Sequence, residues 1–118
     1  MTLVNQERAK AGCQPVKANA KLTAAAQGHS NDSAARRVLS HTGSDGSSAN
    51  QRVARTGYSA SWVGEVVSLG GSTPAQLMSV WMRGFDRDTI LNCSARELGA
   101  GLATPGGNYW TLVLATPR

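Results

Sequence analysis

The segment WVGEVVS, residues 62–68, is an apolar stretch that carries a single carboxylate, Glu65. Its composition is typical of a β-strand, and on a two-residue period Glu65 shares one face with Val63 and Val67. Burying a carboxylate among apolar side chains costs several kcal/mol unless it is paired or hydrogen-bonded. Two arrangements are open: either this face is solvated, or the fold brings Glu65 a partner, for which a histidine is suited near neutral pH.

The chain has two histidines, and their settings differ. His29 lies within a predicted helix on a face of small residues, where we expect a packed, hydrogen-bonded core residue. His41 follows that helix and precedes residues 42–48, TGSDGSS, whose composition predicts a flexible loop. A side chain in that position can reach a cleft, so His41 is the candidate partner of Glu65. The alternative is an ordinary polar residue at a helix end.

Periodicity and capping residues divide the chain into helices and strands. Helices are predicted over residues 3–11, 20 to about 39, 49–54 and 74–84. Strands are predicted over residues 62–68, 98–103 and 109–115, the last two as an antiparallel hairpin. These elements contain no βαβ repeat, which favours an α+β fold of packed layers. The stretch FDRD, in which Asp86 and Asp88 flank Arg87, is expected to be a solvated turn.

Length and charge narrow the class of protein. The 118 residues fit one domain, residues 1–118, and we expect a monomer. No stretch approaches the ~18 apolar residues of a membrane span. The net charge of +5 comes mostly from scattered arginines, which we interpret as a solvated surface and not as a nucleic-acid site. No signal peptide is visible, so we expect any original signal or anchor to have been removed.

The two cysteines, Cys13 and Cys93, match no zinc or CxxC spacing. They are either two buried thiols or a disulfide. A disulfide would close a loop of about 80 residues, worth roughly 4–5 kcal/mol in the chain-entropy model. It would also imply an oxidising compartment.

Several segments, taken in their order, resemble the CAP superfamily of cysteine-rich secretory proteins, antigen 5 and pathogenesis-related 1 proteins. These segments are LVNQERAKAG, LTAAAQGHSNDSA, LSHTGSDGS, GEVVSLG and RELGAGLA before YWTLVLA. The resemblance covers nearly the whole chain and is closest to the bacterial, SCP-like branch. It implies an α-β-α sandwich with a small antiparallel sheet of about three strands. It also implies a secreted or cell-surface protein with a Cys13–Cys93 disulfide.

The family's central cleft carries two histidines and two acids, which in some members bind a divalent metal such as zinc. By position, His41 resembles the first histidine and Glu65 resembles the acid of the family's GEN motif. Asp86 stands where the second histidine is expected, and Gly84 replaces the second acid. Zinc prefers nitrogen and sulfur ligands and commonly takes three or four. The resemblance therefore implies an incomplete cleft of His41, Glu65 and Asp86, and no cofactor is expected.

Three functions are compatible with these residues. The incomplete ligand set favours a non-catalytic extracellular binding module for a lipid, a cell-wall polymer or a protein. The alternative is a hydrolase or peptidase in which His41, oriented by Glu65, deprotonates water or a loop serine such as Ser44 or Ser47. No GxSxG, HExxH or P-loop motif supports catalysis. The third is a structural domain stabilised by the His41–Glu65 pair.

Overall fold

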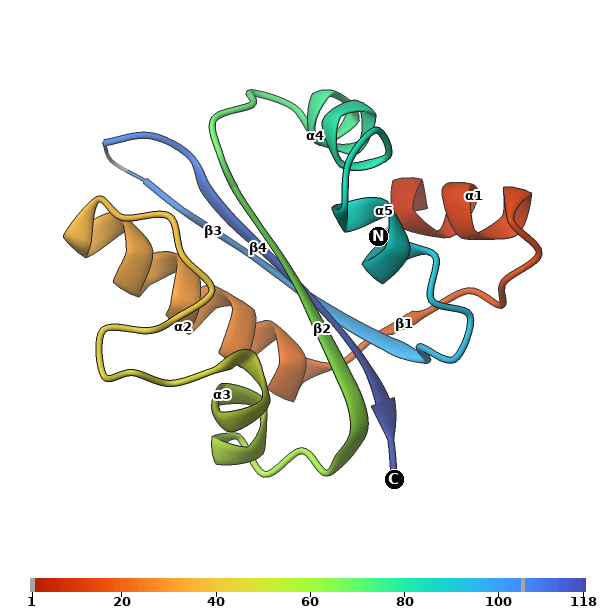
Figure 1. Cartoon of the computed structure of the whole chain (residues 1–118), viewed down its shortest axis with the longest axis horizontal. Helices are drawn as coiled ribbons and strands as arrows, with labels where there is room; N and C mark the ends of the chain where they lie inside the picture. The colour runs from red at the N-terminus through yellow and green to blue at the C-terminus, as the bar shows by residue number, and fades with distance from the viewer. Residues whose placement is uncertain (1, 105) are drawn as a thin grey trace.

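In a computed structural model, which describes residues 2–104 and 106–118, helices cover both faces of one central sheet (Figure 1). Helices α2 and α3 lie on one face, and α1, α4 and α5 lie on the other (Figure 1). This is the α-β-α sandwich that was predicted. The helices are α1 (Thr2–Lys10), α2 (Ala20–Arg36), α3 (Ala49–Arg55), α4 (Pro74–Trp81) and α5 (Asp86–Ile90). The strands are β1 (Lys17–Ala18), β2 (Ala60–Leu69), β3 (Glu97–Ala103) and β4 (Tyr109–Pro117).

The sheet has four strands in the order β1-β3-β4-β2. The predicted β3–β4 hairpin is confirmed, and β2 pairs with β4 in antiparallel register, with Glu65 opposite Val113. The expectation of about three strands was short by one. The additional strand, β1, has only two residues and runs parallel to β3. So short a strand shows no alternation of apolar and polar residues, so the sequence pattern did not reveal it.

Helix α2 packs very close to β3 because the facing surfaces of both elements consist mostly of small residues. A Cβ atom on Gly99 would overlap the backbone of Leu22 and Thr23, and one on Gly101 would lie 2.6 Å from the Cα of Gln27. The face of small residues on this helix was predicted from the sequence. The glycines of β3 pack against that face. The buried residues of α2 are Leu22, Ala25, Ala26, His29, Ser30 and Ser33.

Two predicted boundaries near the helix ends differ from the structure. Helix α2 ends at Arg36, because Arg37 adopts a left-handed conformation (φ 56°) and its N–H bonds back to Ala34 and Ser33. The expected solvated turn at FDRD is instead the short helix α5, with Asp86 and Asp88 in its first turn. Acidic side chains there interact favourably with the helix dipole, and the fully buried Ile90 anchors the helix to the core.

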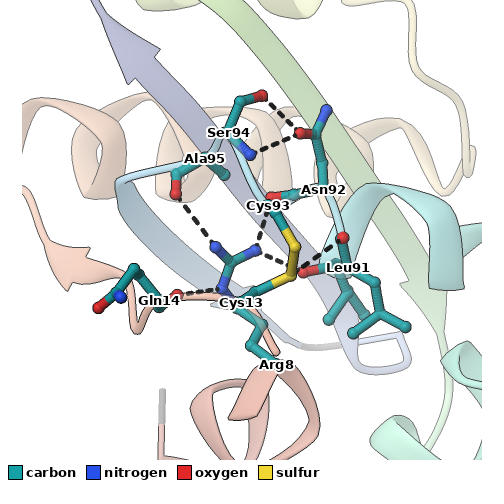
Figure 2. Close-up of a disulfide and its surroundings, with 9 residues drawn as sticks. Arg8, Cys13, Gln14, Leu91, Asn92, Cys93, Ser94 and Ala95 are labelled. Atoms are coloured by element: carbon teal, nitrogen blue, oxygen red, sulfur yellow. Dashed lines mark hydrogen bonds between the residues drawn. A yellow bond between two sulfur atoms is a disulfide. The ribbon is translucent and has the colours of Figure 1, made fainter. Parts of the chain in front are cut away.

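A disulfide between Cys13 and Cys93 joins the segment after α1 to the turn before β3, which confirms the predicted pairing (Figure 2). Arg8 lies beside it with no exposed surface. Within the described ranges, the guanidinium donates hydrogen bonds only to backbone carbonyls, and burial lowers the pKa of Arg8. Its planar set of five donors can hold several carbonyls at once. The carbonyls, at 2.8–3.1 Å, belong to Gln14, Ile90, Asn92 and Ala95.

Among the described residues, none of the helices has the length and apolar character that a membrane crossing requires.

The close approach of α2 and β3 predicts opposite effects of alanine at two glycines. Gly99→Ala forces a Cβ into the α2 backbone, so we expect a loss of about 1–3 kcal/mol in the free energy of unfolding. Gly28→Ala, at an exposed position of α2 with open space around it, should add about 0.5–1 kcal/mol. Urea unfolding of both variants checks this, and equal effects would contradict the proposed packing.

Candidate functional site

Glu65 is a buried carboxylate with two partners. Its side chain is 3% exposed although β2 is an edge strand. One oxygen, Oε1, lies 2.9 Å from Nδ1 of His41, and the other, Oε2, accepts a hydrogen bond of 2.6 Å from Nη2 of Arg52. Of the two arrangements that the sequence left open, the structure therefore shows the one in which Glu65 is buried and paired.

Arg52 was missed as a site residue by the sequence reasoning. Its guanidinium, 10% exposed, also donates to the backbone carbonyls of His41 (3.0 Å) and Ser47 (2.8 Å). A capping box between Ser48 and Gln51 fixes the start of α3, so Arg52 leaves the first turn of this helix in a defined direction. The capping residues were visible in the sequence, but the direction of the helix was not.

The segment between α2 and α3 is a loop, as predicted, but it is tied down and not free. Asp32 accepts a hydrogen bond from the Ser44 N–H (2.8 Å), and this bond lowers the pKa of Asp32. Asp45 accepts from Ser47 and from Arg55 (2.6 Å), which hold the pKa of Asp45 well below its usual range. These contacts hold the loop that carries His41 at a fixed position beside Glu65.

His29 is a buried, hydrogen-bonded core residue, as expected, and it also lies close to the site. It is 1% exposed, and Nε2 lies 2.6 Å from the carbonyl oxygen of Ser40. Because a carbonyl only accepts, Nε2 carries the hydrogen. The same nitrogen is 4.0 Å from Oε1 of Glu65. Sequence reasoning placed His29 in the core without this proximity to Glu65.

His41 combines a fixed ring with an accessible edge. Its side chain is 62% exposed. An ionised carboxylate only accepts hydrogen bonds, so Nδ1 of His41 donates to Glu65, and Nε2 has no hydrogen-bond partner among the described residues. Among the described residues, no hydrogen bond joins His41 to the hydroxyl of Ser44 or Ser47. Neither of the serine nucleophiles considered from the sequence is therefore hydrogen-bonded to the candidate base in the described part of the chain.

Asp86 lies near this group but does not join it. Burial raises the pKa of Asp86, and the nearby His41 partly opposes that rise. Within the described part of the chain, no ion pair links Asp86 to His41 or Glu65. The structure thus brings two of the three predicted cleft residues into contact and leaves the third within electrostatic reach.

The residues present do not fit a zinc site. Across residues 2–104 and 106–118, no three histidine, cysteine or acidic side chains are placed to share a metal ion. Both oxygens of Glu65 are engaged, one of them by the guanidinium of Arg52. A bound cation would have to displace another cation to reach this carboxylate, so Arg52 supplies the positive charge that a metal would otherwise provide.

A second candidate site is an apolar hollow of about 350 Å³ between α1, α4 and the sheet. Trp81 lines it and is 6% exposed, and its indole N–H has no hydrogen-bond partner among the described residues. Trp81 falls within the helix predicted over residues 74–84, but the sequence could not show a space beside it. The other lining residues include Val4, Leu77, Met78, Trp110 and Leu112.

Residues 1–114 match the family model of CAP, the cysteine-rich secretory protein family. No curated protein sequence is similar enough to this chain to count as a match.

Several solved structures share the fold. An extracellular SCP-domain protein of Bacillus anthracis superposes with a TM-score of 0.90 at 20% identity, over 97% of this chain and 38% of that one. An outer surface protein of Borrelia burgdorferi superposes with a TM-score of 0.90 at 13% sequence identity, over 99% of this chain and 89% of that one. A cysteine-rich secretory protein of Staphylococcus aureus superposes with a TM-score of 0.81 at 19% sequence identity, over 97% of this chain and 36% of that one. The chain thus spans less than two fifths of the first and third proteins.

The buried pair predicts a large difference between two neighbouring arginines of α3. Arg52→Met leaves the Glu65 carboxylate buried beside an apolar side chain, so we expect a loss of about 3–5 kcal/mol in the free energy of unfolding. Adding Glu65→Gln to Arg52→Met should recover part of that loss, because the buried charge is then removed.

Arg55→Met is the matched control, because Arg55 also makes a 2.6 Å ion pair, with Asp45, but both side chains are more than half exposed. It should change stability little, because exposed ion pairs are weak. Urea unfolding of the variants measures both effects. Similar losses in the free energy of unfolding for Arg52→Met and Arg55→Met would show that the Glu65–Arg52 pair stabilises the fold no more than an exposed ion pair.

Proposed function

Because the chain belongs to the CAP family of cysteine-rich secretory proteins, we propose that it acts outside the cell as a non-catalytic binding module. Its proposed ligand is an amphipathic molecule, such as a fatty acid, that combines an apolar chain with an oxygen acceptor. An extracellular location is supported by the disulfide, since disulfides persist in oxidising compartments.

The observation that carries this proposal is the unpaired indole N–H of Trp81 beside the apolar hollow. Leaving a buried donor unsatisfied costs about 1–3 kcal/mol. The nitrogen itself is buried in this structure, so a ligand oxygen would satisfy the donor after a small rotation of the Trp81 ring toward the hollow, while the ligand's apolar part covers Leu77 and Leu112. The hollow, at about 350 Å³, lies in the size range of small-molecule sites.

The Glu65 group supports a structural role more than catalysis. Arg52 neutralises the carboxylate, and the hydrogen bonds of Arg52 to the carbonyls of His41 and Ser47 join the loop to β2. These contacts explain a buried carboxylate at an edge strand without a substrate or a metal.

One observation keeps a hydrolase as the second candidate. The contact between Nδ1 of His41 and Glu65 leaves Nε2 free, as in the histidine–carboxylate pairs of hydrolases. With no serine hydroxyl bonded to this histidine, water would be the nucleophile. A His41→Ala protein that cleaves ester or peptide substrates as fast as the parent would exclude this function.

The binding proposal predicts that two tryptophans beside the same hollow differ in importance. Trp81→Phe keeps an aromatic ring, although a smaller one, and removes the indole N–H, so the affinity for dodecanoate should fall about tenfold or more. Trp110→Phe is the control, because its indole N–H already donates to the Gly70 carbonyl at 3.0 Å and is not available to a ligand.

Isothermal titration calorimetry with dodecanoate measures both affinities. The proposal fails if the parent protein takes up no dodecanoate at millimolar concentration, or if Trp81→Phe and Trp110→Phe bind it equally well.

A further inference from the structure

Strand β2 forms one edge of the sheet over ten residues. Viewed down the shortest axis of the molecule, it is the front strand, and no other segment is drawn across it (Figure 1). Helices α3 and α5 contact β2 from opposite sides of the sheet. No other strand of the described residues pairs with the outer edge of β2.

The backbone of this edge has unused hydrogen-bonding groups. In an antiparallel ladder, alternate residues of an edge strand direct their N–H and C=O groups away from the sheet. Apart from the ladder with β4, the backbone of residues 62–69 makes no hydrogen bond with any other described residue. Ala60, just before this stretch, is bonded by Arg118, so the free edge begins after it.

Strand β2 also lacks most of the features that usually protect an edge from pairing. Edge strands are commonly blunted by lysine, proline, charged side chains or bulges. Residues 60–69, ASWVGEVVSL, contain no lysine, arginine or proline. The only charge, Glu65, points inward and is neutralised by Arg52. The register irregularity lies at the very start of the strand, between Ala60 and Trp62.

We propose that this edge binds an extended peptide segment of another protein, which adds to the sheet as a fifth strand beside β2. Main-chain hydrogen bonds supply the affinity in this mode of recognition. Two copies of this chain would each bring a net charge of +5, so their mutual repulsion disfavours pairing of β2 with itself. The same charge favours an acidic peptide as the partner.

The side chains beside the edge indicate what such a peptide would carry. Val63 and Val67 flank Glu65 on one face of β2, so β-branched side chains opposite them would form favourable cross-strand pairs. His41, 62% exposed, contacts Glu65, which lies between these two positions, so the Nε2 of His41 can contact a polar side chain of the peptide. This surface is separate from the apolar hollow under α4, so the inference does not depend on the proposed function.

The test uses amide hydrogen exchange of the whole chain with an acetylated and amidated probe peptide, EVTVTVE. Its alternating valines and threonines suit a strand, and its terminal glutamates provide the negative charge. The matched control is the same peptide with every backbone nitrogen methylated, which keeps side chains and charge but cannot donate hydrogen bonds to the edge. Exchange is followed at each amide of residues 62–69.

We expect the parent peptide at millimolar concentration to slow exchange of alternate β2 amides by on the order of tenfold, and the methylated peptide to leave them unchanged. The proposal is overturned if neither peptide slows exchange or if both slow it equally. It is also overturned if the free protein protects the same amides by dimerising, as sedimentation would show.

Discussion

The ion pair between Glu65 and Arg52 is the interaction that holds together the part of the molecule around His41. It places a carboxylate that is 3% exposed against a guanidinium that is 10% exposed. Because Arg52 also binds the carbonyls of His41 and Ser47, one side chain joins β2, α3 and the loop between α2 and α3. Removing either charge would leave the other buried without a partner, which is the costly case for ion pairs. The position of His41 therefore follows from the pair.

On the opposite side of the sheet, a second buried arginine holds several segments together, but through backbone carbonyls and not through an ion pair. Arg8 is buried, yet it bonds only to backbone carbonyls and meets no carboxylate in the described residues. Together with the disulfide it fixes α1 to the turn that leads into β3 (Figure 2). Helix α1 contributes little else that is buried, apart from Val4. The wall of the apolar hollow formed by α1 is thus positioned by this arginine and this crosslink.

Sequence reasoning succeeded where one residue imposes a local demand. A carboxylate in an apolar strand required either a solvated face or a partner, and small residues on α2 favoured a close neighbour. It did not identify Arg52, because the direction of an arginine side chain depends on how α3 is oriented on the sheet. It also missed β1, which is too short to show a period, and the hollow beside Trp81. An unpaired donor becomes visible only when every nearby acceptor has been placed.

The Glu65–Arg52 pair also occupies the acid of the incomplete family site. The family resemblance implied an incomplete ligand set, and the structure shows a cation of the chain itself, Arg52, bonded to the buried carboxylate of Glu65. In this account the Glu65–Arg52 pair has a structural role, and ligands bind without contacting the Glu65 carboxylate. The hollow beside Trp81 and the free edge of β2 provide two surfaces for such binding on separate parts of the fold.

The most direct test of this account is nitrogen-15 NMR of the His41 ring at alkaline pH, where imidazoles are neutral, before and after adding one equivalent of zinc. With Glu65 locked by Arg52, the ring should show the tautomer protonated at Nδ1, and zinc should leave both ring nitrogen signals unchanged. A ring protonated at Nε2, or a zinc-dependent shift at either nitrogen, would contradict the central claim.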